Sequence, residues 1–300
     1  MTITNKSSQT SIDGGERNAN DGSLPLISVV VAVFNGAATL QRCIDSISCQ
    51  THVAKELIVI DGGSADGTKE ILERQQAKFS YWISEPDDGI YHAWNKGLAQ
   101  ARGEWIYFIG ADDYLWAPDV LYRFALELAR AYPPVRVVYG QVVVVNSRDK
   151  ELNRIGENWQ SVRQRFQEIM CLPHTALMHH RSLFERHGTF DESYRIAGDY
   201  ELLLRELVHQ DALYVPDLVV AGMRHGGVSS DPVGSMTLLR EFRRAQEQNG
   251  LSKPGWIWIS AMARAYMRVW LWRLLGSRIS AYLFDLGRLV SGKKPYWTRQ

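Results

Sequence analysis

This chain of 300 residues has few cysteines and no long uncharged apolar run. Its three cysteines, Cys43, Cys49 and Cys171, lack the spacing of a metal site, and their odd number argues against a disulfide framework. Because the N-terminal residues also lack the charged and then apolar plan of a signal sequence, we expect a reducing, cytoplasmic setting. No stretch reaches the roughly 18 uncharged apolar residues that a spanning helix needs, so the sequence predicts no membrane span.

Three familiar phosphate-binding patterns are also missing. The first apolar run is followed by N-G-A-A-T, where a dinucleotide site would have G-x-G-x-x-G. The P-loop pattern G-x-x-x-x-G-K-[ST] does not occur, and neither does the Gly-rich loop ending in Thr-Arg that sugar-nucleotide pyrophosphorylases use. A dinucleotide site and a P-loop are therefore excluded, and a nucleotidyltransferase is disfavoured.

Charge is unevenly distributed, although the net charge is only +1. Residues 251–300 contain nine Lys or Arg and one acid, Asp285, which gives a net charge of +8 and leaves −7 for the first 250 residues. Such a basic tail suggests an anionic partner. Nucleic acid is disfavoured as that partner, because the basic residues are concentrated in the tail and the rest of the chain is acidic.

Strand and helix patterns alternate four times in the first part of the chain. Nearly continuous β-branched runs predict strands buried on both faces, and the turn and cap residues between them predict helices. The predicted strands are Ile27–Phe34, Glu56–Ile60, Tyr81–Ser84 and Trp105–Asp112, and the helices are Thr39–Cys49, Asp66–Gln76 and Asp87–Ala101. This alternation predicts an α/β fold with a Rossmann-like, doubly wound, mostly parallel sheet that binds ligands at its carboxyl edge.

The rest of the chain is less regular. It predicts helices at Pro118–Ala131 and Asp199–His209, strands within Val135–Val145 and Leu213–Val220, a polar helix or linker over 230–250 and an amphipathic section over 255–290. We expect a disordered N-terminal lead at 1–23, where Ser, Thr, Asn, Asp and Gly dominate. A domain over 24–230 would follow, with halves at about 24–115 and 116–230, and then a basic helical extension over 231–300.

One short run, E-W-I-Y-F-I-G-A-D-D at residues 104–113, ends in two adjacent carboxylates. Asp112 and Asp113 would lie just outside the carboxyl end of a buried strand, where an open α/β sheet binds its ligands. Two neighbouring carboxylates repel each other unless a cation or hydrogen-bond donors hold them, and a hard divalent cation bound to a substrate diphosphate would do so. The alternative is a solvated Asp-Asp turn.

Four motifs, in order along the chain, carry a family resemblance: I-S-V-V-V-A-V-F-N-G, L-I-V-I-D-G-G-S-A-D-G-T, S-E-P-D-D-G-I-Y-H-A-W-N-K-G and R-G-E-W-I-Y-F-I-G-A-D-D. Over about residues 27–230 the chain resembles the inverting family 2 glycosyltransferases, which have the GT-A fold. Within that family it resembles the bacterial enzymes that build capsular, colanic-acid-like or O-antigen polysaccharides. The resemblance implies a nucleotide-diphosphate sugar donor, most often a UDP-sugar, and a divalent cation, Mn or Mg.

The resemblance also implies roles for single residues on the donor side. Asp61 matches the position that contacts the nucleoside base, although Gly62 stands where the family often has a second Asp. His92 replaces a usual acid and is either a changed sugar contact or a surface replacement. The residues implied in donor binding are Val33, Asn35, Asp61, Asp88, Gly89, Asn95, Lys96 and Asp112.

The implied metal ligand is Asp113, and Asp112 would reach the ribose or share the metal. His225 is a further candidate for the metal or the diphosphate, because histidine can complete a metal site and some relatives use a C-terminal one in this way. His174, in P-H-T, is a candidate for the acceptor side or for a structural place in the site. For both histidines an ordinary surface or core position is the alternative.

Asp199, in I-A-G-D-Y-E-L-L-L-R, matches the family's catalytic acid position at the start of a helix. In an inverting transfer the acceptor hydroxyl attacks the anomeric carbon opposite the diphosphate, and one carboxylate takes its proton. Asp199 is the expected general base. The competing interpretation is that it serves as the N-cap of its helix, and one residue can do both.

The basic tail is rich in tryptophan as well as arginine. Trp256, Trp258, Trp270 and Trp272 fall in one amphipathic section, as expected of a helix in a membrane interface where basic residues meet anionic lipid. The alternative is a helix packed on the preceding domain. An interfacial helix would place the protein peripherally on the inner face of the plasma membrane and would suit a lipid-linked acceptor.

Together these patterns predict a metal-dependent inverting glycosyltransferase of surface polysaccharide biosynthesis, which acts on a saccharide or lipid-linked acceptor. A sugar-1-phosphate nucleotidyltransferase and a non-catalytic sugar-nucleotide-binding protein are the alternatives. Pyrophosphate release would reveal the first, and transfer that EDTA abolishes would exclude the second. The sequence leaves the sugar, the acceptor, the linkage and the oligomeric state undetermined.

Overall fold

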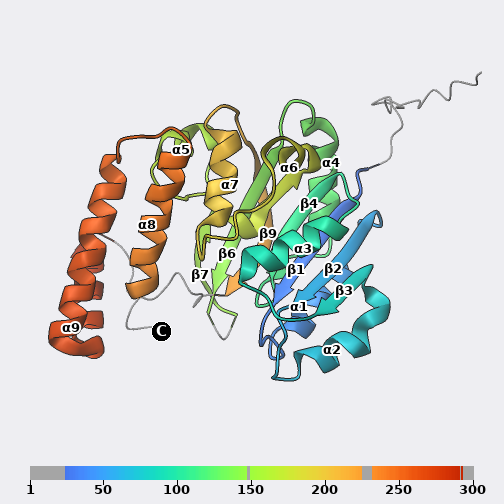
Figure 1. The fold of residues 1–300 in the computed structure, drawn as a ribbon, viewed down its shortest axis with the longest axis horizontal. Helices are drawn as coiled ribbons and strands as arrows, with labels where there is room; N and C mark the ends of the chain where they lie inside the picture. Colours follow the sequence, from blue (N-terminus) through green and yellow to red (C-terminus); the bar gives the residue numbers. More distant parts are fainter. Residues whose placement is uncertain (1–23, 147–148, 225–231, 291, 293–300) are drawn as a thin grey trace, which may run out of the picture.

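The computed structural model describes residues 24–146, 149–224, 232–290 and 292. The predictions for residues 1–23 and for His225 fall outside these ranges. Within them one nine-stranded sheet runs in the order β3-β2-β1-β4-β8-β6-β9-β5, and β7 pairs with β6. Figure 1 shows the sheet in the middle of the molecule, with β2 and β3 at its right and the helices α8 and α9 at its left.

The N-terminal part of the sheet is parallel and its strands are joined by helices. β1, β2, β3 and β4 pair in parallel, with Val33 at the end of β1 opposite Asp61 at the end of β2. A short 3-10 turn, Gln76–Lys78, precedes β3. The elements are β1 (Ile27–Val33), α1 (Leu40–Ser48), β2 (Lys55–Asp61), α2 (Thr68–Gln75), β3 (Tyr81–Ser84), α3 (Ile90–Gln100) and β4 (Trp105–Gly110).

The second part of the sheet is mixed. β8 is antiparallel to both β4 and β6, β9 is parallel to β6, and β5 is antiparallel to β9. A 3-10 turn, η2 (His174–Ala176), leads into β8. The elements are β5 (Tyr114–Leu115), α4 (Val120–Ala131), β6 (Val137–Val145), β7 (Glu151–Ile155), α5 (Trp159–Phe166), β8 (Leu177–His180), α6 (Arg181–His187), α7 (Gly198–Leu207) and β9 (Leu213–Arg224).

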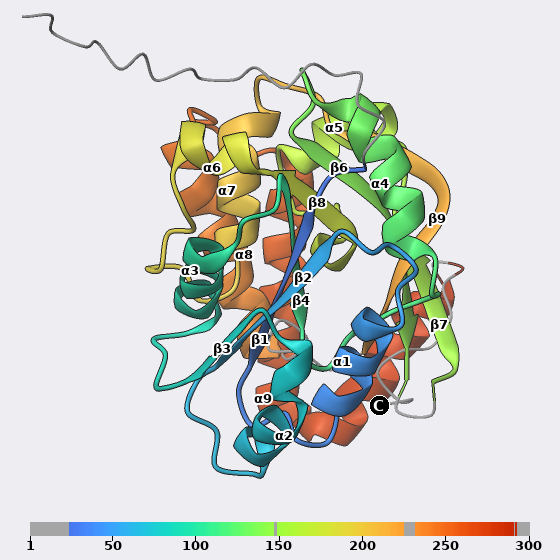
Figure 2. The ribbon, with the colours of Figure 1, turned by 90° about the vertical axis from the view of Figure 1, so that its right-hand side faces the viewer.

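Alternate residues of the central strands enter two separate cores, one on each face of the sheet. Along β1, Val30 joins one core and Val29 and Val31 join the other, as the period of two in a strand requires. The first core packs under α3, α5, α6, α7 and α8, and the second under α1, α2 and α4. Figure 2 looks along the sheet and shows α3, α7 and α8 on one side and α1 and α4 on the other.

The C-terminal helices α8 (Pro232–Gln248) and α9 (Trp256–Val290) continue the first core. α8 contributes Leu239, Phe242 and Ala245, and the first part of α9 contributes Met262 and Ala265. Gly276 has a positive φ of 74° inside α9 and therefore breaks the helix into two parts. The first part of this extension is thus packed into the domain, as one of the two interpretations of the tail anticipated.

The predicted α/β class and the doubly wound, mostly parallel sheet are confirmed. The predicted strand that carries the two carboxylates ends at Gly110, two residues early, because the chain turns there: the Asp113 N–H donates to the Gly110 carbonyl at 3.1 Å. The sequence prediction missed β5, β7, β8, α5 and α6. Each is short, at two to eight residues, so its hydrophobic pattern spans too few residues to be recognised.

Candidate active site at the carboxyl edge of the sheet

The loops after β1 and β2 are bound to each other. Asn35, with a left-handed φ of 50°, donates its N–H to the Ser64 hydroxyl at 2.7 Å and accepts the Ala65 N–H on its amide oxygen at 3.0 Å. Val33 is buried in the core, and its carbonyl accepts the Gly62 N–H at 2.9 Å. Both residues were predicted to bind the donor. In the structure Asn35 connects the loop after β1 with the loop after β2, and the Val33 carbonyl binds the start of the loop after β2.

Asp61 lies at the end of β2 and is fully buried. Its carboxylate accepts the Ser84 hydroxyl at 2.6 Å and the Ser64 N–H at 3.2 Å, and the Ser64 hydroxyl lies against it as well. These contacts connect the ends of β2 and β3 with the loop that follows β2. Asp61 is thus placed at the site, with its oxygens engaged by serine donors.

The Asp-Asp pair before α3 divides into one buried and one exposed carboxylate. Asp87 has a side chain only 8% exposed and pairs with Lys96 at 2.6 Å, whereas the Asp88 side chain is 95% exposed. Lys96 also pairs with Glu85 at 2.8 Å. Burial lowers the pKa of Lys96, but the hydrogen bonds that its ammonium donates to Asp87 and Glu85 outweigh burial, so the pKa is raised overall and Lys96 stays a cation.

Gly62 and Phe34 lie beside Asp87, a residue that the sequence prediction did not assign to the site. A Cβ on Gly62 would be 3.3 Å from both the Asp87 carboxylate and the Phe34 ring. Phe34 is 68% exposed although it directly follows a buried strand. The glycine thus leaves room between an exposed aromatic ring and a buried carboxylate.

His92 and Asn95, both on α3, have structural partners. His92 Nδ1 accepts the Asp88 N–H at 3.1 Å, so His92 closes the turn before α3 and is more than a surface replacement. Asn95 accepts the Phe190 N–H at 3.1 Å and donates to the Phe190 carbonyl at 2.9 Å. Asn95 therefore binds α3 to the backbone before α7, and Gly89, with φ of 121°, permits the turn that starts α3.

The predicted carboxylate pair lies in the turn between β4 and β5. Asp113 is 7% exposed and Asp112 is exposed. Asp113 accepts the Arg224 N–H at 3.0 Å and the Thr175 hydroxyl at 3.3 Å. A Cβ on Gly110 would be 2.7 Å from the Asp112 carboxylate, so a larger residue there would displace this exposed side chain. Asp113, but not the exposed Asp112, is therefore held by donors from β9 and η2.

Burial, and then the charge of Asp112, raise the pKa of Asp113 to about 8 against the two hydrogen bonds that lower it. An uncompensated pair of carboxylates, one of them buried, fits a hard divalent cation, which takes oxygen ligands. Among the described residues no cluster of three or more His, Cys, Asp or Glu side chains is arranged to hold a metal. A cation bound by Asp112 and Asp113 would therefore need further ligands. His225, the other residue predicted to bind the metal, directly follows Arg224 and lies outside the described residues.

The η2 segment connects Asp113 with the aromatic core under α3. Thr175 contacts Asp113, and its carbonyl accepts the Tyr107 hydroxyl at 2.7 Å. The next residue back, His174, stacks on Trp94 with ring centroids 4.8 Å apart. Burial lowers the pKa of His174, while the negative charge of Asp199 opposes the shift, so His174 is neutral.

Asp199 is the second residue of α7, and the N-cap is Ala197. The interpretation of Asp199 as the N-cap is therefore wrong, and its carboxylate makes other contacts. Its Oδ1 accepts the Tyr200 N–H at 2.8 Å and lies 3.3 Å from the Tyr91 hydroxyl of α3. Helix α3, which carries several of the predicted donor residues, is thus in direct contact with the predicted base.

Four contributors to this site were missed at the sequence level. Thr175 and the Arg224 backbone hold Asp113, Tyr91 contacts Asp199, and Asp87 pairs with Lys96. Asp87 stands beside the predicted Asp88, and Tyr91 lies inside the third motif, so both carried a local signal. Thr175 and Arg224 carried none, because each lies more than 60 residues from Asp113 along the chain.

Comparison with known proteins matches residues 28–188 to the family model described as "Glycosyl transferase family 2". A PGL/p-HBAD biosynthesis glycosyltransferase of Mycobacterium tuberculosis is 31% identical over 221 residues, which cover 72% of this chain and 84% of the relative. An uncharacterized glycosyltransferase of the same organism is 35% identical over 185 residues, 61% of this chain and 69% of the relative.

Two solved structures share the fold. The mannosyltransferase PcManGT from Pyrobaculum calidifontis, in complex with GDP-Man and Mn2+, superposes with a TM-score of 0.61 at 21% identity, over 92% of this chain and 83% of that one. TarS residues 1–349 of S. aureus, in complex with UDP-GlcNAc, superpose with a TM-score of 0.58 at 17% identity, over 73% and 66%. The two superpositions thus show that the chain shares the fold of these proteins.

Proposed function

Because the chain belongs to glycosyl transferase family 2, we propose that it is an inverting transferase with Asp199 as the general base. Its donor would be a nucleotide-diphosphate sugar, and a divalent cation, Mn or Mg, would bind the diphosphate at Asp112 and Asp113. The product would belong to a surface polysaccharide or glycolipid. Family membership makes a nucleotidyltransferase or a non-catalytic binding protein the weaker interpretation.

The observation that carries this proposal is the physical link between the two acidic positions. Thr175 of η2 contacts Asp113 at 3.3 Å, and the ring of the adjacent His174 stacks on Trp94 of α3 with centroids 4.8 Å apart. From the other side, Tyr91 of α3 lies 3.3 Å from Asp199. A diphosphate at the buried carboxylate and a base at the start of α7 would therefore flank one reaction space.

The chemistry follows from this arrangement. The acceptor hydroxyl oxygen bonds to the anomeric carbon, the bond from that carbon to the diphosphate oxygen breaks, and the nucleoside diphosphate leaves with the electron pair. Asp199 takes the hydroxyl proton. Because the contacts of Asp199 with Tyr91 and with the Tyr200 N–H both use Oδ1, we assign the proton to Oδ2. A cation at Asp112 and Asp113 would offset the charge on the departing diphosphate.

The donor would bind at the ends of β1 and β2. The exposed ring of Phe34, next to Gly62 and Asp87, offers a flat apolar surface for a nucleoside base. Nucleotide sugars of two kinds occupy the similar solved structures, UDP-GlcNAc in TarS and GDP-Man in PcManGT. A UDP-sugar remains our preferred donor for this chain.

A lipid-linked acceptor would bring the protein to the inner face of the membrane through α9. No helix in the described part of the chain is long and apolar enough to cross a membrane. α9 nevertheless exposes large apolar side chains: Trp256 is 78% exposed, Trp270 61% and Leu274 60%. Exposed Trp and Leu on a basic helix are typical of an interfacial segment.

The central test is Asp199→Asn together with a screen for the donor. A panel of UDP-glucose, UDP-GlcNAc, dTDP-glucose and GDP-mannose with Mn2+ is scored by the rise in Tm, and the nucleotide sugar with the largest rise is used for turnover. D199N should lose about 10²–10⁴-fold in kcat, the usual contribution of a general base, and should keep the donor-dependent rise in Tm.

Asp217→Asn is the matched control, because Asp217 is an exposed residue of β9 with a positive φ that Asn also tolerates. It should leave kcat and the donor-dependent Tm unchanged. Wild-type turnover in D199N would refute Asp199 as the base. Full turnover after EDTA treatment would refute the metal.

A further inference from the structure

We propose that Glu241, on α8, is a positioning residue for Asp199, so that the first C-terminal helix belongs to the catalytic apparatus. The proposal rests on the role given above to Asp199 as the base. Glu241 lies 42 residues beyond Asp199 in a segment that the sequence assigned to a separate extension. Its side chain reaches the backbone immediately before α7.

The contact consists of three backbone N–H groups that converge on one carboxylate. The Arg195 N–H donates to one oxygen of Glu241 at 2.9 Å, and the N–H groups of Ile196 and Ala197 donate to the other, both at 2.8 Å. Hydrogen bonds to a charged acceptor are about twice as strong as neutral ones. The three consecutive peptides are therefore fixed together by a single side chain.

These peptides determine where Asp199 lies. Ala197 is the N-cap of α7, and Asp199 follows two residues later in the first turn. A helix N-terminus carries a partial positive charge, which favours an anion there. Because the backbone from Arg195 to Asp199 is short and continuous, a shift of the three N–H groups moves the Asp199 carboxylate with them.

Tyr91 holds the same peptides from the opposite side. Its hydroxyl donates to the Ile196 carbonyl at 2.6 Å, so Ile196 is bound by α8 through its N–H and by α3 through its carbonyl. The Tyr91 ring also packs against Gly198, where a Cβ would come within 2.9 Å. The backbone before Asp199 is thus clamped between the donor-side helix and α8.

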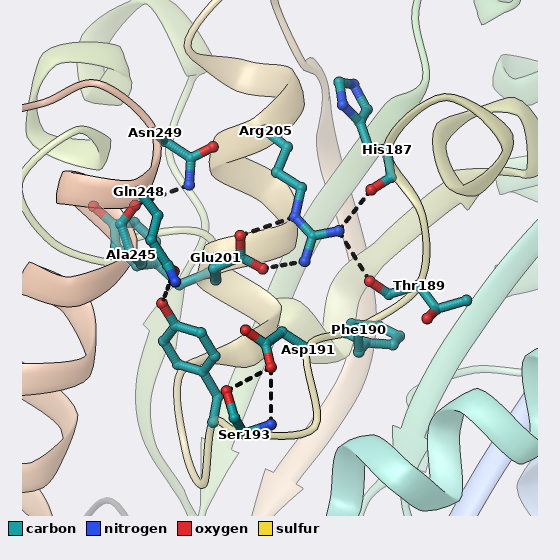
Figure 3. A network of polar contacts seen from close by, with 12 residues as sticks. His187, Thr189, Phe190, Asp191, Ser193, Glu201, Arg205, Ala245, Gln248 and Asn249 are labelled. Carbon is teal, nitrogen blue, oxygen red and sulfur yellow. Dashed lines mark hydrogen bonds and ion pairs between the residues drawn. The ribbon is translucent and has the colours of Figure 1, made fainter.

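The rest of the loop between α6 and α7, residues 188–197, is anchored to the same helices. Arg205 of α7 donates to the carbonyls of His187, at 2.7 Å, and Thr189, at 3.0 Å, as Figure 3 shows. From α8, Gln248 accepts the Tyr194 hydroxyl at 2.5 Å, and Arg244 donates to the Ser193 hydroxyl at 2.6 Å. The loop is therefore held along its length, and among its contacts with α8 those of Glu241 lie nearest to Asp199 along the chain.

The test measures donor hydrolysis, with water as the acceptor, in the full-length protein with Mn2+ and the nucleotide sugar that raises Tm most. Glu241→Gln keeps the size of the side chain but replaces one acceptor oxygen with an amide, which can no longer accept an N–H. We expect kcat to fall by about 10²-fold, as small misplacements of reacting groups do, with the donor KM within about twofold of wild type.

Glu247→Gln is the matched control on the same helix. Glu247 pairs with Arg243 one turn away at 2.9 Å, and its carboxylate makes no hydrogen bond to the described loop before α7. It should keep wild-type kcat and KM. Wild-type kcat in E241Q, while D199N is inactive, would overturn the positioning role and leave the proposed function intact.

A double-mutant cycle separates positioning from general destabilisation. If Glu241 acts through Asp199, E241Q combined with D199N should be no slower than D199N alone. Losses that multiply would overturn the inference. Wild-type turnover in D199N would instead overturn the proposed function, and the inference with it. If E241Q does not fold, Glu241→Asp, which keeps the charge but shortens the side chain by one methylene and so withdraws the carboxylate from the three N–H groups, enters the same cycle with the same expected and contrary outcomes.

Discussion

At the scale of single residues, Asp113 is a buried carboxyl group next to a second acid, Asp112. Burial and the neighbouring Asp112 raise the pKa of Asp113 to about 8, well above the ordinary 3.8. In the unfolded chain the carboxyl ionises near its ordinary pKa, whereas in the fold it keeps its proton until about pH 8. The metal-free protein should therefore lose stability from this group as the pH rises from about 4 to about 8.

Asp113→Asn tests this sign directly. The amide has no charge to bury, so in EDTA the free energy of unfolding of D113N, relative to wild type, should be higher at pH 8 than at pH 5. Urea titrations at the two pH values measure it. Asp88→Asn, at a side chain that is 95% exposed, should show no such difference. A D113N effect equal at both pH values would contradict the raised pKa.

At the scale of elements, the N-K-G motif of α3 fixes the helix in place. Asn95 binds the Phe190 backbone, Lys96 pairs with Asp87, and Gly97 lets α3 approach β1. A Cβ on Gly97 would come within 2.3 Å of the Val30 side chain. The motif therefore stabilises the position of α3, from which Tyr91 reaches Asp199. This structural role does not depend on a contact of Asn95 or Lys96 with the donor.

Gly97→Ala should accordingly destabilise the protein by about 1–3 kcal/mol through overpacking, even though alanine favours a helix. Gly287→Ala in α9 is the control, because nothing lies within 4 Å of its added Cβ. That change should be neutral or stabilising by up to about 1 kcal/mol. Denaturant unfolding measures both. Equal effects in the two variants would show that the approach of α3 to β1 is not tight.

At the scale of the whole molecule, the C-terminal helices α8 and α9 have a buried side and an exposed side. α8 and the first part of α9 complete the core under the base, and the Trp258 ring N–H donates to the Leu239 carbonyl at 2.7 Å. The opposite surface of α9 carries exposed apolar side chains, Trp270 and Leu274 among them. One extension can thus support α7, which carries Asp199, on its buried side and present apolar side chains to a membrane on its exposed side.

Trp270→Glu tests the outward surface without disturbing the inward one. Moving an exposed Trp into a lipid interface is favourable by roughly 1.5 kcal/mol or more, so its loss should weaken binding to anionic phosphatidylglycerol vesicles about tenfold. Val53→Glu makes the same charge change at a loop residue that is 90% exposed and should not alter binding. Cosedimentation measures both. Unchanged binding in W270E would argue against a membrane role for this surface.

Local patterns predicted much of this molecule, because they depend on near neighbours along the chain. The buried β-branched runs predicted the parallel strands, and the acid pair after a strand predicted a carboxylate site at the sheet edge. The short elements escaped prediction, since two to eight residues give too little periodicity. Asp88 was chosen over Asp87 because sequence cannot tell which of two adjacent acids is buried.

By itself, therefore, the sequence determined the fold class, the order of the motifs and the family resemblance that the comparisons bear out. Only the tertiary structure decided which side chains meet: that Arg224 and Thr175 hold Asp113, that Tyr91 lies against Asp199, and that Glu241 binds the backbone before α7. The physical reason is distance along the chain. These pairs are separated by tens of residues and meet only when the sheet brings distant segments to one edge and the helices pack against it.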